Sequence, residues 1–346
     1  MKILIVQQKM IGDVLTSTVL FERLKKKHPN AELHFLINTH TFPVVENHPH
    51  VDQIVFFSPK VEQNYWELLK FLWRIKKQKY DVVIDIYGKL SSNLISIFSG
   101  AKTKISYYKK HTSFMYTHTI KRIQKPENGL SLALENRIKL LHPLNINFKG
   151  VRPKIYLSEK EVHAARSFLS KNGLDLNKPI FMIGILGSNP SKTYPNQYMA
   201  TLIDEIGKFL NAQILFNYIP SQIEQVDVIF NACLADTKKK IYKSVYTHKL
   251  RDFIAVTAQC NALIGNEGGA VNIAKALNVP TFALFCPKLN KKNWFGCKEE
   301  SKHVAIHLDD FDDLSSVTKS DLKTQYLEMT PERILPKLNL FLDNLA

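Results

Sequence analysis

Cysteine is scarce in this chain of 346 residues: there are only four, all in the second half, and none forms a Cys-x-x-Cys pair. This scarcity argues against a disulfide scaffold or a zinc ribbon and is typical of proteins in a reducing cytoplasm. No apolar run approaches the ~20 residues that a membrane-spanning helix needs. Residues 1–6 lack the cleavage region of a signal peptide. The sequence therefore predicts a soluble, cytoplasmic protein.

Acidic residues are also few, because 31 Asp and Glu stand against 47 Lys and Arg, a formal net charge of +16. The positive charge is unevenly distributed. Residues 1–150 hold 23 basic and 11 acidic side chains, a net charge of +12, which is three quarters of the total excess. A basic surface of that size favours an anionic partner such as a nucleic acid, an anionic lipid or a phosphorylated substrate. A generally basic, solubilising surface is the plainer alternative.

Several motifs of well-known enzyme classes are missing. Residues 7–12 contain one glycine where the dinucleotide fingerprint needs three, so NAD binding is a weak interpretation. No Walker A, His-Glu-x-x-His or nucleophile-elbow pattern occurs. The acidic run 309–313 is better interpreted as a solvated loop than as a metal site. His303 and His307 share one face of a strand about 13 Å apart, too far to hold one ion.

Strand and helix patterns alternate along the first half. Short, β-branched apolar runs predict buried parallel strands at 3–6, 33–37, 54–57 and 82–85. Apolar residues at helical spacing predict helices over 14–27 and 66–77. Strands that alternate with helices indicate an α/β protein built on open parallel sheets.

The pattern restarts after a hinge-like segment at 148–153, which divides the chain into domains 1–150 and 151–346. In the second half, strands are predicted at 180–185, 214–216, 262–265 and 281–285, and helices over 198–210 and 331–345. At roughly 150 residues per domain, the length also favours two domains. We expect a ligand site between them, where strand carboxyl ends and helix N-termini converge.

The first of three motifs that could carry chemistry joins the first predicted strand to the first helix. In Met-Ile-Gly-Asp, Gly12 allows the backbone to approach a ligand closely, and Asp13 begins the helix. Aspartate is a favoured helix cap, so capping and a functional carboxylate are both open here.

The second motif follows the first strand of the second half. Small residues precede a lysine in a strand-to-helix loop, which suits a phosphate group, at Gly187, Ser188 and Lys192. An ordinary polar loop is the alternative.

In the third motif a strand runs into residues 266–269, Asn-Glu-Gly-Gly. Paired glycines at a helix N-terminus expose N–H groups to an anion, and the adjacent carboxylate can accept hydrogen bonds from sugar hydroxyls.

Taken together, these motifs resemble glycosyltransferase family 9, the ADP-heptose:lipopolysaccharide heptosyltransferases and their relatives, over essentially the whole chain. The resemblance implies an α/β protein of GT-B fold, with two Rossmann-like domains facing across a cleft. Residues 1–150 would bind the acceptor, and residues 151–346, which end in a terminal helix, would bind the nucleotide sugar. It further implies inverting, metal-independent transfer of a heptose or related sugar from a nucleotide diphosphate, with no cofactor.

The resemblance also implies roles for individual residues. Asp13 matches the catalytic base, with Gly12 beside it on the acceptor side, and Lys192 matches the lysine that neutralises the leaving diphosphate. The donor pocket would consist of Gly187, Ser188, Lys192, Asn266, Glu267, Gly268 and Gly269, with no metal ligand.

Three departures concern the substrates. Many members have Asp-Thr-Gly where this chain has Glu267-Gly268-Gly269, and histidine where it has Asn272. They also commonly have serines where it has Lys9 and Met10. The donor sugar therefore stays open, with an ADP-linked donor expected.

The basic first half suits an anionic glycolipid acceptor at a membrane surface, with the enzyme peripheral on the inner face of the inner membrane. The expected patch is Lys102, Lys104, Lys109, Lys110, Lys121 and Arg122. A nucleotide-sugar hydrolase or epimerase of the same shape is one alternative, and it would turn over donor without acceptor. A nucleic-acid-binding protein is suggested only by the charge. No basic motif interleaved with aromatics supports it, so we expect no nucleic-acid partner.

Overall fold

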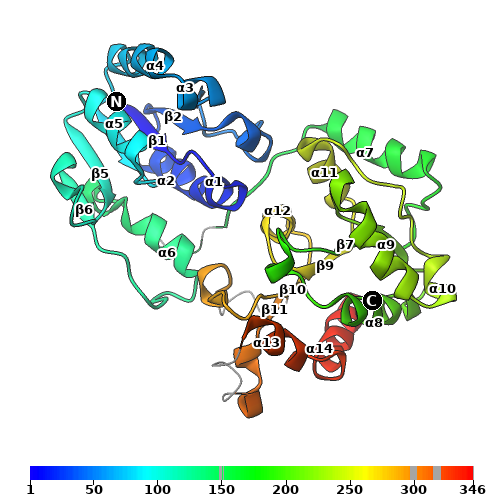
Figure 1. Cartoon of the computed structure of the whole chain (residues 1–346). Coiled ribbons are helices and arrows are strands. Elements are labelled where there is room, and N and C mark those ends of the chain that lie inside the picture. Colours follow the sequence, from blue (N-terminus) through cyan, green and yellow to red (C-terminus); the bar gives the residue numbers. More distant parts are fainter. Residues whose placement is uncertain (148–149, 151, 297–301, 315–320, 346) are drawn as a thin grey trace. The chain divides into compact units, whose positions relative to one another are not determined.

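The computed structural model describes residues 1–147, 150, 152–296, 302–314 and 321–345. The chain forms two compact units, Met1–Tyr156 with Lys292–Gly296, and Leu157–Lys291 with Cys297–Ala346 (Figure 1). Of the predicted hinge at 148–153, residues 148, 149 and 151 lie outside the described part. The expected boundary at 150 did not include the return of Lys292–Gly296 to the first unit. That segment packs tightly there, since a Cβ on Gly296 would lie 2.5 Å from the Gly129 carbonyl oxygen.

The first unit is built on a parallel sheet in the order β3-β2-β1-β4-β5-β6. Its strands are β1 (Lys2–Val6), β2 (Glu32–Ile37), β3 (Gln53–Phe56), β4 (Val82–Asp85), β5 (Thr103–Tyr107) and β6 (His118–Ile120). The sequence analysis did not predict β5 and β6. They are neighbours at one side of the sheet, and their polar residues interrupt the apolar run that marks the central strands.

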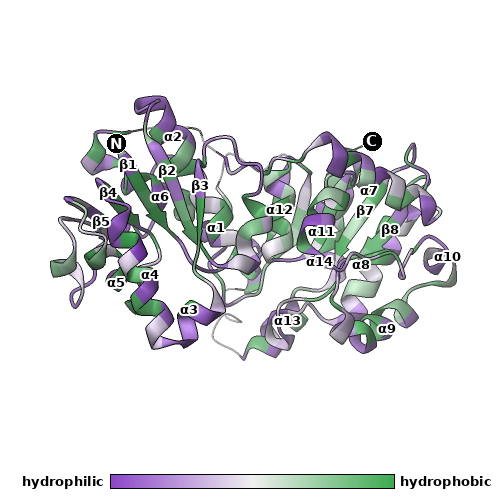
Figure 2. Ribbon diagram, turned by 90° about the horizontal axis from the view of Figure 1, so that it is seen from above, coloured by the Kyte–Doolittle hydropathy of each residue, from purple (hydrophilic) through white to green (hydrophobic). Residues whose placement is uncertain are grey.

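Helices cover both faces of this sheet. They are α1 (Ile11–Ser17), α2 (Val19–Lys27), α3 (Pro59–Gln63), α4 (Tyr65–Lys77), α5 (Leu90–Phe98) and α6 (Leu132–Lys139), with short helices η1 (Thr39–Val44), η2 (Ser113–Met115) and η3 (His142–Leu144). The single helix predicted at 14–27 is two helices that divide at Thr18, whose hydroxyl donates to the Leu15 carbonyl. Contacts join α4 to α5, and α6 to α1 and α2. Figure 2 shows α4 and α5 on the opposite side of the sheet from α2.

The second unit has a parallel sheet in the order β11-β10-β9-β7-β8. Its strands are β7 (Ile180–Gly184), β8 (Gln213–Phe216), β9 (Ala262–Asn266), β10 (Thr281–Leu284) and β11 (His303–Ile306). Its helices are α7 (Glu159–Lys171), α8 (Asn196–Lys208), α9 (Ile223–Ala232), α10 (Ala235–Lys238), α11 (Leu250–Thr257), α12 (Gly269–Ala276), α13 (Leu322–Glu328) and α14 (Pro331–Asp343), with short helices η4 (Pro190–Lys192), η5 (Pro220–Gln222), η6 (Lys291–Asn293), η8 (Leu308–Asp310) and η9 (Asp312–Leu314).

Each unit has a hydrophobic core of its own. In the first, Phe71, Leu72 and Ile75 of α4 pack with Leu4 and Val83 of the central strands. In the second, the core extends from β7 to the last helix, where Ile334, Leu338 and Phe341 of α14 are buried. The predicted terminal helix is therefore part of the second unit's core. Both sheets are parallel, so the carboxyl ends of neighbouring strands meet at one edge of each sheet.

Candidate functional site

Asp13 lies at the carboxyl edge of the first sheet, on α1, which follows β1. The residue that caps α1 is Met10, and no side chain makes a capping hydrogen bond there. Asp13 is therefore in the first turn of the helix, and its carboxylate is used elsewhere. Oδ1 accepts a hydrogen bond of 2.6 Å from Nη2 of Arg137. Of the two interpretations of Asp13, helix capping is not what the structure shows.

Arg137 comes from α6 and is almost entirely buried, with 7% of its side chain exposed. Its other nitrogens are also engaged: Nε donates to the Ser17 hydroxyl at 3.0 Å, and Nη1 donates to the Ala133 carbonyl at 3.0 Å. A guanidinium held by several acceptors is a rigid support for the carboxylate that it binds.

The sequence analysis did not identify Arg137. A signal was present, however. Leu134 and Leu141 are buried at helical spacing on either side of it, so an arginine interrupts an apolar face. A buried arginine is rarely left without an anionic or hydrogen-bonding partner.

The remaining carboxylate oxygen of Asp13 is available. Within the described residues Oδ2 has no hydrogen-bond partner, and 35% of the side chain is exposed. The adjacent Gly12 is buried, and its carbonyl accepts a hydrogen bond of 2.6 Å from Thr16. The carboxylate is thus fixed on one side and open on the other, as a group that accepts a proton from a ligand would need to be.

A second carboxylate at this edge, Asp85, was also missed by the sequence analysis. It ends β4 and is fully buried, accepting hydrogen bonds from the Gly88 amide at 2.8 Å and the Tyr116 hydroxyl at 2.6 Å. Burial raises the pKa of the Asp85 carboxyl. Because solvent does not reach it, we assign it to holding the turn between β4 and α5. Its signal in the sequence is an aspartate that closes an apolar strand.

The predicted basic patch does not form one surface. Lys102 and Lys104 lie at the start of β5, which is the amino edge of the sheet, away from Asp13. The remaining members follow β5 or β6 at the carboxyl edge: Lys109, Lys110, Lys121 and Arg122. These residues were grouped because they are close in the sequence. In the structure the extended strand β5 places Lys102 and Lys104 at one end and Lys109 and Lys110 beyond the other. At the carboxyl edge, Arg122 lies 3.8 Å from the ring centroid of Tyr107.

In the second unit, the predicted donor residues lie on two adjacent loops, because β7 pairs directly with β9 and Gly184 is in register with Gly265. The loop after β7 folds back sharply at Gly187. A Cβ there would lie 2.2 Å from the Lys192 carbonyl oxygen, so only glycine fits. The Gly187 amide donates to the Thr193 hydroxyl at 3.1 Å. This turn presents Ser188 at the surface.

Asn266 holds the two loops together. Its amide nitrogen donates to the carbonyls of Gly184 and Ile185, both at 3.0 Å, and its oxygen accepts from the Tyr194 amide at 2.7 Å. The side chain is buried and both of its N–H donors are used. The geometry therefore favours a positioning role for Asn266 over direct contact with a donor.

Glu267 comes directly before Gly268, the residue that caps α12. Burial raises the pKa of the Glu267 carboxyl, and the charge of Lys192 opposes that shift. Within the described residues the Glu267 carboxylate has no hydrogen-bond or ion-pair partner. Gly268 caps α12, and a Cβ built on it would have no atom within 4 Å. The first N–H groups of α12, which starts at Gly269, have no partner within the helix, as at any helix N-terminus.

The acidic run 309–313 is engaged within its own unit. Asp310 pairs with Lys291, and Asp313 pairs with Arg333 at 2.7 Å. His303 and His307 are buried and bonded to different partners, the Thr281 hydroxyl and the Pro287 carbonyl. In the described part of the chain, no three acidic, histidine or cysteine side chains are grouped as metal ligands would be.

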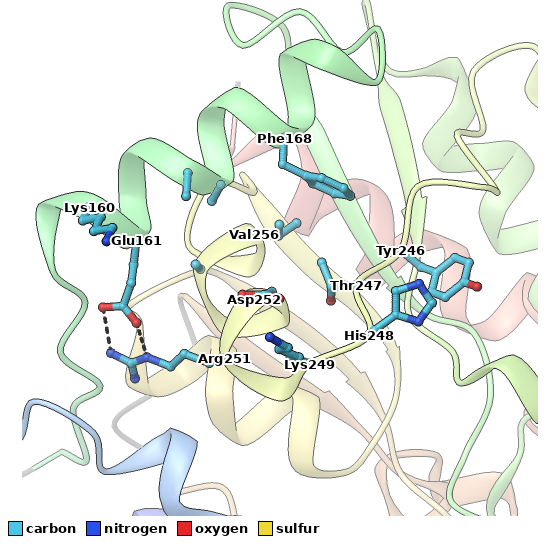
Figure 3. A pocket seen from close by; sticks show the side chains of 13 residues that line it. Lys160, Glu161, Phe168, Tyr246, Thr247, His248, Lys249, Arg251, Asp252 and Val256 are labelled. Atoms are coloured by element: carbon cyan, nitrogen blue, oxygen red, sulfur yellow. Dashed lines mark hydrogen bonds and ion pairs between the residues drawn. The ribbon is translucent and has the colours of Figure 1, made fainter.

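A pocket of about 500 Å³ lies between α7 and α11 in the second unit, apart from these loops. Figure 3 shows Phe168 on its wall, the Glu161–Arg251 pair at one end, and Tyr246 and His248 at the other. None of the predicted site residues lines it. Arg251 Nη2 donates to Glu161 at 3.1 Å, and the Arg251 guanidinium lowers the pKa of the Glu161 carboxyl to about 2.

Comparison with known proteins identifies the family. The sequence model described as glycosyltransferase family 9 (heptosyltransferase) matches residues 68–321, nearly three quarters of the chain. The chain belongs to glycosyltransferase family 9. Lipopolysaccharide heptosyltransferase 1 of Campylobacter coli is 23% identical over 312 residues, which cover 85% of this chain and 86% of the relative.

Solved structures give the fold of this family 9 protein. A glycosyltransferase family 9 protein from Veillonella parvula superposes with a TM-score of 0.83 at 19% identity, covering 99% of this chain and 97% of the other. ADP-heptose lps heptosyltransferase II of E. coli gives 0.75 at 19% identity, with both chains fully covered. The fold is therefore GT-B, as the sequence predicted, and the family 9 protein is a glycosyltransferase. Among the described residues, no helix has both the length and the apolar character to cross a membrane.

Proposed function

We propose that this glycosyltransferase transfers a heptose or related sugar, with inversion and without a metal or cofactor, from an ADP-linked donor to an anionic acceptor of the lipopolysaccharide core or lipid A type. Relatives that match over most of this chain are named lipopolysaccharide heptosyltransferases, which supports the choice of sugar and acceptor. The observation that carries the mechanism is the carboxylate of Asp13, clamped on one oxygen by buried Arg137 and open on the other.

In the proposed reaction, Asp13 Oδ2 accepts the proton of the acceptor hydroxyl while that oxygen attacks the anomeric carbon. The bond from the anomeric carbon to the diphosphate oxygen breaks, and its electron pair leaves with the nucleotide diphosphate. Attack opposite the leaving group inverts the configuration. General-base catalysis of this kind contributes about 10²–10⁴-fold to a rate. Arg137 acts through Asp13 by fixing the direction of the carboxylate.

The second unit supplies the donor side of the proposal. Lys192 and the N–H groups at the start of α12 would offset the charge that develops on the leaving diphosphate, with Gly187 and Ser188 forming the rest of the phosphate loop. Gly268 and Gly269 leave room for the phosphates, and Glu267 would accept hydrogen bonds from donor hydroxyls. Asn266 keeps the two loops in register.

The test measures release of nucleotide diphosphate from ADP-heptose and from common ADP-, UDP- and GDP-sugars, each in EDTA. Each donor is assayed with and without a deeply truncated lipopolysaccharide acceptor. The proposal expects release from one ADP-sugar that requires the acceptor and persists in EDTA. Release without acceptor would indicate a hydrolase or epimerase instead. Activity lost in EDTA and restored by Mg²⁺ or Mn²⁺ would contradict metal independence.

A further inference from the structure

Helix α4 carries aromatic side chains on the side that faces away from the sheet. Tyr65, Trp66 and Trp73 are 68%, 70% and 59% exposed, although the whole chain has only three tryptophans. Trp66 and Trp73 are seven residues apart, so they share one face of the helix. The opposite face of α4 packs into the core through Phe71 and Ile75. The exposed aromatics are therefore not part of the core.

The neighbouring helix α5 extends this apolar surface. It contains no charged residue, and Leu90, Ile97 and Phe98 are 74%, 40% and 42% exposed. Trp73 and Phe98 line a shared groove of about 610 Å³ between the two helices. Phe114, in η2 beside α5, is 79% exposed. We call the surface formed by these exposed side chains of α4, α5 and η2 the α4–α5 face. Figures 1 and 2 show the neighbouring helices α4 and α5.

Basic residues are interleaved with these apolar ones. The exposed lysines and arginine on and beside the two helices are Lys70, Arg74, Lys76, Lys77, Lys79 and Lys89. The Lys77 ammonium lies 3.6 Å from the ring centroid of Trp73. On α4 the acidic residue is Glu67, which is shared at 3.5 Å between Lys60 and Lys70. The face therefore has a strong positive excess.

We infer that the α4–α5 face binds an anionic lipid bilayer. Tryptophan and tyrosine settle at the boundary between lipid headgroups and acyl chains, and lysine stems lie along apolar surface while their charged ends reach anionic headgroups. A protein interface fits less well, because lysine is depleted from such interfaces whereas here it alternates with tryptophan. The exposed lysines and arginine of this face complement the negative charge of anionic headgroups.

The α4–α5 face reaches the carboxyl edge of the first sheet, where Asp13 lies. Leu90 begins α5 directly after the β4 turn, at the sheet edge where Asp13 lies. The Ser91 hydroxyl donates to Oε1 of Gln8 at 2.7 Å, which ties α5 to the loop that precedes α1. A bilayer against this face would hold a lipid-linked substrate near Asp13. Bilayer binding itself goes beyond the proposed function, since it is tested with vesicles that contain no sugar acceptor.

The experiment uses the full chain with vesicles of phosphatidylcholine, with or without phosphatidylglycerol. In the Trp294→Phe variant, Trp66 and Trp73 are the two remaining tryptophans, so emission excited beyond the tyrosine absorption band comes from them. We expect vesicles with phosphatidylglycerol to shift that emission to shorter wavelength, and lipids brominated on the acyl chain to quench it. Phosphatidylcholine alone should have little effect, and added salt should weaken the binding. Unchanged emission with the anionic vesicles would overturn the inference.

Co-sedimentation with vesicles, using two pairs of variants and matched controls, distinguishes binding by this face from non-specific binding by other exposed residues. Trp66→Ser with Trp73→Ser, and Lys70→Glu with Lys77→Glu, should each weaken vesicle binding by on the order of tenfold or more. The controls are Leu210→Ser with Leu234→Ser, equally exposed in the second unit, and Lys160→Glu with Lys171→Glu. Equal loss in variants and controls would overturn the inference. The inference would also be overturned if the wild-type protein bound no vesicles and formed a dimer, and the tryptophan variant were a monomer. Thermal melts confirm that each variant is folded.

Discussion

At the scale of single residues, the partner of a carboxylate decides what it can do. Asp13 and Glu267 both sit at the start of a helix that follows a buried strand. Asp13 is clamped by Arg137, whereas Glu267 is partly buried without a hydrogen-bond partner in the described part of the chain. The first carboxylate is held in one direction by its partner, whereas burial penalises the charge of the second.

Replacing Asp13 with asparagine should remove transfer and keep donor binding. The change deletes the basic oxygen but little volume, so we expect the turnover number to fall by about 100-fold or more. Acceptor-dependent nucleotide release measures the loss, and calorimetry with ADP measures donor binding. Ser17→Ala is the control, because it removes a partner of Arg137 and leaves the Asp13 pair intact. Near-normal turnover of Asp13→Asn would exclude this residue as the base.

Replacing Glu267 with glutamine should stabilise the fold at neutral pH. Burial raises the folded-state pKa of Glu267 above its ordinary value of 4.5, so the ionised form is penalised in the folded state. That group's contribution to stability is present below the unfolded pKa and is lost as pH rises through the folded pKa. We expect Glu267→Gln to raise the melting temperature by about 1–4 °C at pH 7.

The gain should disappear near pH 4, where the native carboxyl is protonated too. Glu224→Gln, an exposed change on α9, is the control and should leave the melting temperature unchanged. A melting temperature for Glu267→Gln below that of the native protein at pH 7 would mean that the carboxylate has a stabilising partner.

At the scale of elements, helix starts hold most of the groups that we assign to the site. α1 presents Asp13 and α12 presents its N–H groups, while the start of α7 has a structural role. There the Ser158 and Glu161 side chains cap the helix, and Glu161 also binds Arg251 of α11. This pair joins two helices of the second unit, which pack against each other.

Glu161→Gln should weaken this connection in a pH-dependent way. The folded-state pKa of Glu161 is lowered to about 2, so its stabilising contribution is present above the unfolded value of 4.5 and is lost as pH falls towards 2. We expect a lower melting temperature for the variant at pH 7 and little difference near pH 2–3. Glu159→Gln, two residues earlier in the same helix and exposed, should leave the melting temperature unchanged. A difference between native and Glu161→Gln proteins that is constant with pH would contradict the ion pair.

At the scale of the whole molecule, charge and folding are divided between two units. Each unit has its own parallel sheet and core, and three quarters of the positive excess lies in residues 1–150. The polar loops that we assign to the donor all belong to the second unit. The basic and apolar surface that we assign to the membrane belongs to the first.

Hydrogen exchange with and without ADP tests this division. We expect ADP to slow exchange of the amides in 186–193 and 265–272, because bound phosphates accept hydrogen bonds from loop and helix N–H groups. Amides in 89–116 should exchange at the same rate in both conditions. Protection that appears in 89–116 and is absent from the two loops would place the nucleotide in the first unit.

Much of the fold was predictable because it follows from local patterns. Apolar, β-branched runs identified β1, β2, β4 and β7, since buried parallel strands have little other signature. β5 and β6 were missed because their polar residues break that pattern. One helix was predicted where Thr18 divides two, because a short break leaves the apolar period intact.

The sequence by itself determined the family, the parallel α/β architecture and the candidate loops, because turns and helix starts depend on residues next to one another in the chain. Only the tertiary structure paired Asp13 with Arg137, which are 124 residues apart, and buried Asp85 beneath Tyr116. It also separated Lys102 and Lys104, at the amino edge of the sheet, from the lysines at its carboxyl edge. Contacts of this kind arise when strands align in a sheet and bring their ends together, and no local pattern in the sequence records that alignment.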